Sequence, residues 1–233
     1  MPWPELVIFD CDGVLVDSEI IALAQMRRAL GEAGLAMSEA QTLDYCLGLR
    51  LETVLRNAES DLGSALPSAF GTDLAQEILA RLDADVQGIA GVPEALARID
   101  ARVCVASSSA PERIARSLAM AGYASLFGPH VFSAHMVARG KPSPDLFLYA
   151  AQQMAVSPGQ CLVIEDSLAG VLGAVAAGMA AFGFVGGGHF TASPNHGDRL
   201  AAAGAHLVFD KMQLLPDIIA ACARQRAEKT IGA

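Results

Sequence analysis

Short apolar runs recur along the chain, and helix-like stretches separate most of them. The runs have the length of buried parallel strands, and five or six can be placed: Leu6–Phe9, Val103–Ala106, His130–Phe132, Cys161–Ile164, Ala180–Val185 and His206–Phe209. Helical patterns stand between the later runs, at Pro111–Gly122, Pro144–Met154 and Ser167–Gly178. Strands that alternate with helices in this way predict an α/β fold with a doubly wound, Rossmann-like parallel sheet.

The interval between the first and second strand is much longer than one crossover connection requires. It spans roughly ninety residues and contains no convincing strand pattern. Amphipathic helical stretches fill it instead, at Ser18–Ala33, Ser38–Cys46, Leu51–Ser60 and Thr72–Asp83. We therefore expect an inserted helical domain over residues 17–85, carried by a core domain that consists of residues 1–16 and 86–233.

One uncharged segment, Leu168–Gly188, is long enough to cross a bilayer. Its seven Gly and six Ala gain little from transfer into lipid, so a buried helix, a Gly turn and a buried strand are the better interpretation. The first residues, Met-Pro-Trp-Pro-Glu, lack the basic region of a signal peptide. We expect a cytoplasmic protein with no membrane partner.

The composition changes this picture in two respects. Sixteen Lys and Arg stand against 25 Asp and Glu, and this net charge of −9 argues against binding to nucleic acid or to anionic membranes. The five cysteines are odd in number and form no C-x-x-C pair, and the five histidines lack ligand spacing, so the sequence indicates neither a disulfide framework nor a zinc site. Any anion site must therefore be built locally.

Candidate chemistry begins where the first strand ends. Asp10 and Asp12 are two residues apart, and in an extended strand such positions share a face, so both carboxylates can point into one crevice. Gly13 permits a sharp turn of the backbone directly afterwards. Two carboxylates at this spacing repel each other unless a divalent cation lies between them or one carries a proton, and both conditions serve phosphoryl transfer.

The ends of later strands carry complementary groups. Ser107, Ser108 and Ser109 follow the second strand, where hydroxyl and N–H groups can hold phosphate oxygens. Lys141 precedes a helix and can neutralise a transferring phosphoryl group. Glu165 and Asp166 form a second carboxylate pair after another strand, and oxygen ligands of this kind suit Mg²⁺. Because parallel strands end at one edge of the sheet, these groups are expected to meet there.

These segments resemble four motifs of a known family. Asp10-Cys11-Asp12-Gly13-Val14, Ser107, Gly140-Lys141-Pro142-Ser143-Pro144 and Ile164-Glu165-Asp166-Ser167-Leu168-Ala169-Gly170 are similar, in this order, to those of the haloacid dehalogenase-like hydrolase superfamily. The match spans nearly the whole chain. It looks like the subgroup with a helical cap after the first motif, which includes sugar-phosphate phosphatases, phosphoglycolate phosphatases and β-phosphoglucomutases.

The resemblance implies a role for each motif residue. Asp10 would be the nucleophile that forms an aspartyl phosphate, and Asp12 would protonate the leaving oxygen and then activate water. Ser107 and Lys141 would bind phosphoryl oxygens, with Ser108 beside them. Mg²⁺ would be held by Asp10, the backbone carbonyl of Asp12, and Asp166, with Glu165 as a direct or a water-mediated ligand.

The same resemblance ranks the reactions. Dehalogenases and phosphonoacetaldehyde hydrolases of the family lack the acid at the position of Asp12, so a leaving oxygen that needs a proton is favoured here. The mutases carry a His about where Ile20–Ala22 stand, and a Lys where Ala110-Pro111 occurs, and this chain lacks both. A phosphatase is therefore preferred, and a β-phosphoglucomutase-like phosphomutase is the alternative. A phosphoacceptor signalling domain and a catalytically silent binding protein fit less well.

A helical cap over the site would restrict the substrate to a small phosphorylated metabolite, such as a sugar or polyol phosphate. In the cap, Leu47-Gly48-Leu49-Arg50 resembles the loop that reaches the active site in related capped enzymes. Gly48 and Arg50 are therefore the candidates for contact with a substrate hydroxyl or carboxylate. A monomer is expected, with an oligomer left open.

Overall fold

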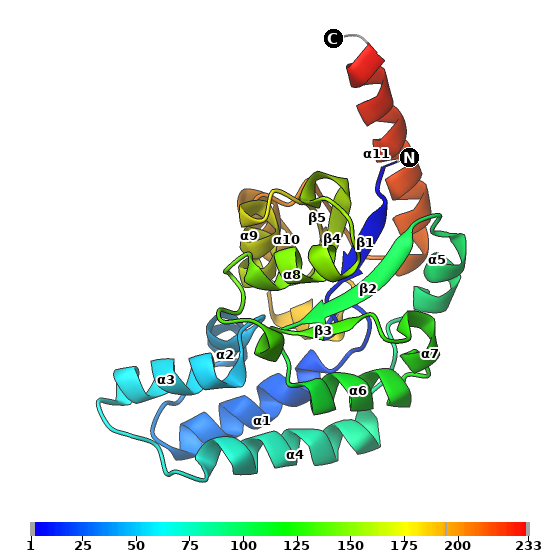
Figure 1. Ribbon diagram of the computed structural model, residues 1–233. Helices are drawn as coiled ribbons and strands as arrows, with labels where there is room; N and C mark the ends of the chain where they lie inside the picture. The colour runs from blue at the N-terminus through cyan, green and yellow to red at the C-terminus, as the bar shows by residue number, and fades with distance from the viewer. Residues whose placement is uncertain (1–2, 194, 232–233) are drawn as a thin grey trace.

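The computed structural model describes residues 3–193 and 195–231 and contains a six-stranded, all-parallel sheet (Figure 1). The strand order is β3-β2-β1-β4-β5-β6, so the chain starts near the centre of the sheet and winds outward in both directions. The strands are β1 (Leu6–Phe9), β2 (Arg102–Ser107), β3 (Val131–Ser133), β4 (Cys161–Glu165), β5 (Ala180–Phe184) and β6 (Leu207–Phe209). The predicted fold class is confirmed, and each expected strand bound lies within one residue of the observed one.

Both faces of the sheet are covered, because side chains alternate along buried strands. Val7 and Phe9 of β1 belong to one buried cluster, and Leu6 and Ile8 belong to a second cluster on the opposite face. The first cluster includes residues of α5 (Val92–Arg98), α6 (Pro111–Met120), α7 (Ala124–Phe127) and α11 (Leu215–Ile231). The second includes residues of α8 (Asp145–Gln153), α9 (Leu168–Ala176) and α10 (His196–Ala202).

Five helices stand between β1 and β2, and the first four occupy the interval in which the sequence indicated inserted helices. These four are α1 (Glu19–Glu32), α2 (Glu39–Cys46), α3 (Leu51–Leu62) and α4 (Phe70–Asp85). Their apolar faces form a third buried cluster, which includes Leu30, Val54 and Leu82 and which also takes in Phe190 from the segment after β5. Figure 1 shows these helices gathered at one end of the sheet. The division into a core and a cap domain stays a prediction.

The helices expected from the sequence are observed within two residues of their bounds, but α5, α7, α10 and α11 were not assigned there. The first three are short. Among the α11 side chains that the structure describes, the buried apolar ones lie in the first half, so the helix has little apolar periodicity to detect. Leu168–Gly188 forms α9, a turn at Gly178 with φ of +72°, and β5. None of the helices in the described ranges is long and apolar enough to cross a membrane.

Candidate active site

Three buried carboxylates meet where β1 and β4 end. Asp10 follows β1, Glu165 is the last residue of β4, and Asp166 comes next. The two strands are adjacent in the sheet, with Phe9 paired to Ile164, so their carboxyl ends lie side by side. One oxygen from each carboxylate lies within 4.8 Å of the others. Asp10, Glu165 and Asp166 are called the acidic cluster below.

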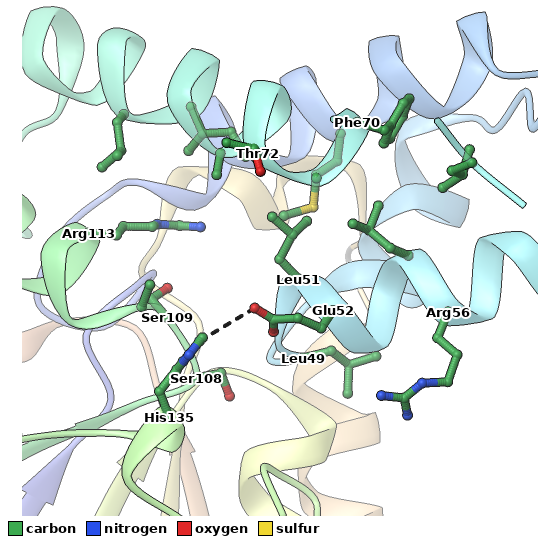
Figure 2. A pocket seen from close by; sticks show the side chains of 18 of the residues that line it. Leu49, Leu51, Glu52, Arg56, Phe70, Thr72, Ser108, Ser109, Arg113 and His135 are labelled. Carbon is green, nitrogen blue, oxygen red and sulfur yellow. Dashed lines mark ion pairs between the residues drawn. The ribbon is translucent and has the colours of Figure 1, made fainter. Parts of the chain in front are cut away.

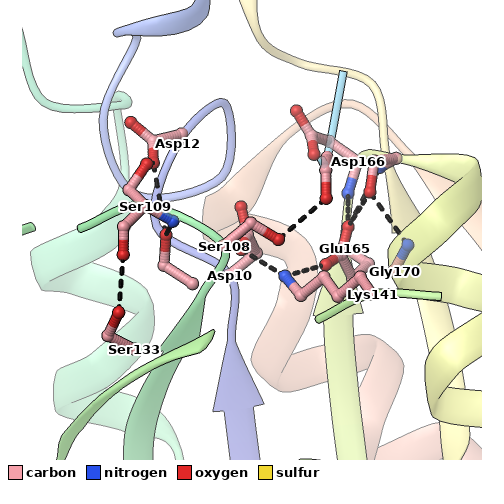
Figure 3. Close-up of polar contacts among 12 residues, drawn as sticks. Asp10, Asp12, Ser108, Ser109, Ser133, Lys141, Glu165, Asp166 and Gly170 are labelled. Carbon is pink, nitrogen blue, oxygen red and sulfur yellow. Dashed lines mark hydrogen bonds and ion pairs between the residues drawn. The ribbon is translucent and has the colours of Figure 1, made fainter. Parts of the chain in front are cut away.

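Lys141 is the cation closest to the acidic cluster. It arrives on the loop before α8, and its side chain is 1% exposed. Its Nζ donates to Asp10 Oδ1 over 2.5 Å and also to Glu165 Oε1 (Figure 3). Burial by itself would lower the pKa of Lys141, but the two carboxylates raise it overall, so the side chain stays charged. One ammonium therefore faces three carboxyl groups.

The excess of carboxylates alters their own protonation. Burial raises the pKa of Asp10 well above its ordinary value, and the charges of Glu165 and Asp166 raise it further against the opposing effect of Lys141. Burial and the charge of Glu165 raise the pKa of Asp166 in the same way. Asp166 Oδ2 is also buried without a hydrogen-bond partner. Hard oxygen ligands, surplus negative charge and an unpaired oxygen all fit a divalent cation such as Mg²⁺.

Glu165 differs from the other two acids in how it is held. Its Oε2 accepts hydrogen bonds from the backbone N–H groups of Asp166 and Ser167 and from the Ser167 hydroxyl. A Cβ at Gly170 would lie 1.9 Å from this carboxyl group, so only glycine fits on that side. Glu165 is thus fixed by the start of α9, with its other oxygen turned to Lys141.

The side chain of Asp12 does not join the acidic cluster. Figure 3 shows it turned toward the loop after β2, where Ser109 donates to it. Its Oδ2 accepts from Ser109 over 2.7 Å and from Ser107 over 3.3 Å. Its Oδ1 accepts from Ser18 over 2.5 Å and from the Arg113 guanidinium over 2.7 Å. The carboxylate is therefore held by four donors, which come from the end of β2, the loop after it, α6 and the residue before α1.

These donors set the charge state of Asp12. Burial alone would raise its pKa, but the charge of Arg113 and the hydrogen bonds from Ser18, Ser109 and Arg113 lower it overall. Glu19 lies 3.9 Å from Arg113, and burial raises the pKa of this Glu to about 7. Asp12 is therefore the ionised partner of Arg113, and Glu19 is a weaker second partner near neutral pH.

A cavity of about 690 Å³ lies between the inserted helices and the loop after β2 (Figure 2). Residues of α3 and α4 form one wall, and Ser108, Ser109 and Arg113 form another. These same three residues also line the small hollow at Asp10, Asp12 and Asp166, whose volume of about 20 Å³ has room for about one water. The arrangement provides a large chamber for the body of a ligand, next to a small hollow that Asp10, Asp12 and Asp166 line.

The remaining predicted site residues are Ser108, Gly48 and Arg50, and each contacts another loop of the protein. Ser108 Oγ donates to the Gly48 carbonyl over 2.8 Å, which joins the loop after β2 to the loop after α2. Gly48 has φ of +76°, and a Cβ there would lie 2.2 Å from Ser167 Oγ. Arg50 donates from its Nη2 to the carbonyl oxygens of Ala134 and Val137, so its guanidinium is bound to the loop after β3. Contact of Gly48 or Arg50 with a substrate stays a prediction.

Sequence reasoning missed several groups around Asp12 and Asp166. Arg113 is one, although it lies four residues after Ser109 in the first turn of α6, a spacing that brings a side chain back toward the helix start. His189 and His196 are others: His189 Nε2 lies 3.1 Å from Asp166 Oδ2, and His196 Nε2 lies 2.6 Å from the Asp166 carbonyl oxygen. The position of His189 in the segment after the carboxyl end of β5 was the available signal for it, whereas His196 opens α10 and had no such signal.

Known proteins are similar to the chain over most of its length. A family model described as haloacid dehalogenase-like hydrolase matches residues 4–178. The 6-phosphogluconate phosphatase of Escherichia coli (strain K12) is 30% identical over 181 residues, which cover 77% of this chain and 82% of that protein. Hexitol phosphatase A of the same organism is 35% identical over 186 residues, which cover 73% and 78%. A solved structure of a conserved haloacid dehalogenase-like protein from Agrobacterium tumefaciens str. C58 is 41% identical, with a TM-score of 0.81 over 94% of this chain and 99% of that one.

The chain therefore belongs to the haloacid dehalogenase-like hydrolase family. Within that family, it is a phosphatase, as its named sequence relatives are. The resemblance read from the four motifs is confirmed at the level of family and enzyme class. The individual residue roles, the cation and the substrate are matters for the proposal that follows.

Proposed function

We propose that the chain is a Mg²⁺-dependent phosphatase that hydrolyses a small phosphorylated metabolite through an aspartyl phosphate on Asp10. The observation that carries this proposal is the position of Asp10. Its carboxylate lies in the acidic cluster, bonded to Lys141, and it lines a hollow that adjoins the large cavity. A nucleophile, a phosphate-binding cation and a chamber for the rest of the substrate thus occur together.

In the first step, a carboxylate oxygen of Asp10 attacks phosphorus, and the bond between phosphorus and the leaving oxygen breaks. Lys141 binds a phosphoryl oxygen, as does Ser107, whose hydroxyl faces the same hollow. The raised pKa of Asp10 is a cost, because attack requires the ionised form. Asp10 and Asp166 would hold Mg²⁺, with Glu165 beside them, and the bound cation supplies charge neutralisation for an anionic nucleophile that approaches an anionic substrate.

Asp12 would transfer the protons. It gives a proton to the leaving oxygen in the first step, and it takes one from the water that attacks the aspartyl phosphate in the second. The bond to Arg113 and the lowered pKa favour the ionised form, which suits the second step. Proton donation in the first step requires Asp12 to take up a proton from solvent beforehand, and loss of its bond to Arg113 would favour this, because that guanidinium holds its pKa low.

The substrate class follows from the chamber and from the relatives. The cavity of about 690 Å³ is within the usual range for small-molecule sites, and a polymer or a folded phosphoprotein would not fit beneath α3 and α4. Its polar lining includes Glu52, Arg56 and Thr72, which offer both donors and acceptors to hydroxyl groups. A sugar or polyol phosphate is the substrate class we infer, in line with the relatives that act on 6-phosphogluconate and hexitol phosphates.

The decisive experiment is a phosphate-release assay over a panel of sugar, polyol and glycolate phosphates, with Mg²⁺ or with EDTA. We expect turnover of at least one sugar or polyol phosphate with Mg²⁺, and loss of that turnover with EDTA. Asp10→Asn keeps the size of the side chain and removes the nucleophile, so it should show no turnover. Asp17→Asn is the matched control, because Asp17 lines neither cavity and is not a member of the acidic cluster.

Three results would contradict the proposal. They are no turnover of any panel member, full activity with EDTA, and undiminished activity of Asp10→Asn. Conversion of a hexose 1-phosphate to its 6-phosphate without net phosphate release would replace the phosphatase with the mutase alternative. Monomeric state and cytoplasmic location stay predictions.

A further inference from the structure

His189 lies against the acidic cluster without belonging to it. It stands on the 3-10 helix η3 (Gly188–Ala192) after β5, and its side chain is 1% exposed. Its Nε2 is 3.1 Å from Asp166 Oδ2. The Mg²⁺ ligand set that we propose does not use this imidazole.

The atoms that face each other here are buried and unsatisfied. Both ring nitrogens of His189 and the Oδ2 atom of Asp166 have no hydrogen-bond partner among the described residues. The distance suits a hydrogen bond, but the N–H is not aimed at the oxygen. Buried polar atoms without partners are rare in folded proteins, and a small rotation of the ring would pair these two. A hydrogen bond between Nε2 and Oδ2 would satisfy both atoms.

A second imidazole holds the backbone of the same residue. His196 Nε2 lies 2.6 Å from the carbonyl oxygen of Asp166, and the His196 side chain is buried. The ring of Phe190 lies between the two histidines, with centroid distances of 3.8 Å to His189 and 4.4 Å to His196. Asp166 is thus contacted at its carboxylate and at its carbonyl by one packed set of rings.

The space around His189 is also closed by glycines. A Cβ at Gly13 would lie 1.9 Å from Asp166 Oδ2 and 2.8 Å from His189 Cε1, and one at Gly187 would lie 2.6 Å from the same ring carbon. Gly13 directly follows Asp12, so the imidazole packs against the loop that carries both proposed catalytic aspartates. Phe190 belongs to the buried cluster of α1–α4, so the ring set connects Asp166 to the inserted helices.

We propose that His189 is a positioning residue for Asp166: the neutral imidazole donates from Nε2 to Oδ2 and so fixes the carboxylate as a magnesium ligand. This inference rests on the proposed function, because it assigns a partner to one member of the proposed ligand set. Hydrogen bonds to ligating carboxylates orient them, and the loss of such a partner typically costs about 10–100-fold in metal affinity.

The test is calorimetric titration of the full chain with Mg²⁺ for three variants. His189→Phe keeps a ring but removes the donor, and its dissociation constant should rise by about 10–100-fold. His189→Gln can place an amide N–H near the position of Nε2, so its affinity should stay close to that of the unmodified chain. His189→Asn places its amide one bond length short, and it should resemble His189→Phe. His206→Asn is the control, because His206 is exposed and lies outside both cavities of the site.

The same variants are assayed for phosphate release at increasing Mg²⁺. A positioning role predicts a raised KM for Mg²⁺ in His189→Phe with kcat largely recovered at saturation. A Mg²⁺ affinity unchanged in His189→Phe would overturn the inference. If His189→Phe fails to fold, equal affinities of the Gln and Asn variants would overturn it instead. Tight, His189-dependent Mg²⁺ binding without turnover of any substrate would sink the proposed function but not this inference, and absence of Mg²⁺ binding would sink both.

Discussion

Lys141→Met tests how much the single buried ammonium stabilises the acidic cluster. Methionine keeps the unbranched stem, which packs near the ring of Phe147, 5.3 Å from the Nζ atom, and it removes only the charge and its donors. Asp10 and Glu165 are then left buried without their common cation. Removal of one partner from a buried ion pair costs about 3–5 kcal/mol, because the remaining charge is no longer compensated.

The expected loss is large enough to measure by thermal unfolding. For a chain of this size, about 3–5 kcal/mol corresponds to a fall in Tm of about 6–20 °C with EDTA present. Mg²⁺ should restore part of the loss, because it neutralises the same carboxylates. Lys211→Met, at an exposed position, is the control and should change the free energy of unfolding by less than about 0.5 kcal/mol.

A double variant separates the charge effect from loss of packing. In Lys141→Met/Glu165→Gln, one uncompensated carboxylate is gone, so the double variant should be more stable than Lys141→Met alone. Turnover should fall about 10²–10³-fold in Lys141→Met, the usual cost of losing one group that stabilises developing charge. The reasoning is refuted if Lys141→Met with EDTA is as stable as Lys211→Met, or if the second substitution adds a further loss.

Three other outcomes follow from the charges at the site. Arg113→Met removes the charge that holds the pKa of Asp12 low, so the acid limb of the kcat profile should move to higher pH, while Arg116→Met on the exposed side of α6 should leave it in place. Burial raises the pKa of Glu19 from 4.5 to about 7. Its protonated form therefore contributes folding stability that is fully present below pH 4.5 and is lost as the pH rises through about 7. The free energy of unfolding of Glu19→Gln, relative to that of the unmodified chain, should therefore increase from pH 5 to pH 8 by on the order of 3 kcal/mol, as measured by denaturant unfolding. An equal difference at both pH values would contradict this. Finally, because the pKa of Asp10 is raised, its protonated form contributes stability to the metal-free protein that is fully present below pH 3.8 and is lost as the pH rises. Mg²⁺ binds the ionised form, so it should raise Tm more at pH 8 than at pH 5. A Mg²⁺ effect that is larger at pH 5 would show that protons and the cation do not compete for this site.

Much of the fold could be predicted because its signals are local. Apolar runs such as Leu6–Phe9 mark strands that are buried on both faces, and the long interval before Arg102 marks the inserted helices. The helix α11 escaped prediction because its buried apolar side chains, among those described, lie in its first half, and α5, α7 and α10 escaped it because they are short. Their existence depends on the surface that the rest of the core offers them.

Part of the candidate site could also be predicted from the sequence. Asp10, Glu165 and Asp166 were found from sequence because they end or follow strands, and all parallel strands end at one edge, whereas Lys141 was found because it lies just before a helix. The expectation that they meet is confirmed by the acidic cluster and its bond to Lys141. Their catalytic and metal-binding roles remain proposals.

The sequence by itself determined the order of the strands, the family, and the presence of Asp10, Lys141, Glu165 and Asp166 near the sheet edge, because strand periodicity and motif spacing are properties of neighbouring residues. Only the tertiary structure decided which way each side chain turns. It placed Asp12 on Arg113 and away from the acidic cluster, and it brought His189 to Asp166. The physical reason is that such pairings depend on backbone segments far apart in the chain, and on burial that makes an unpaired charge costly.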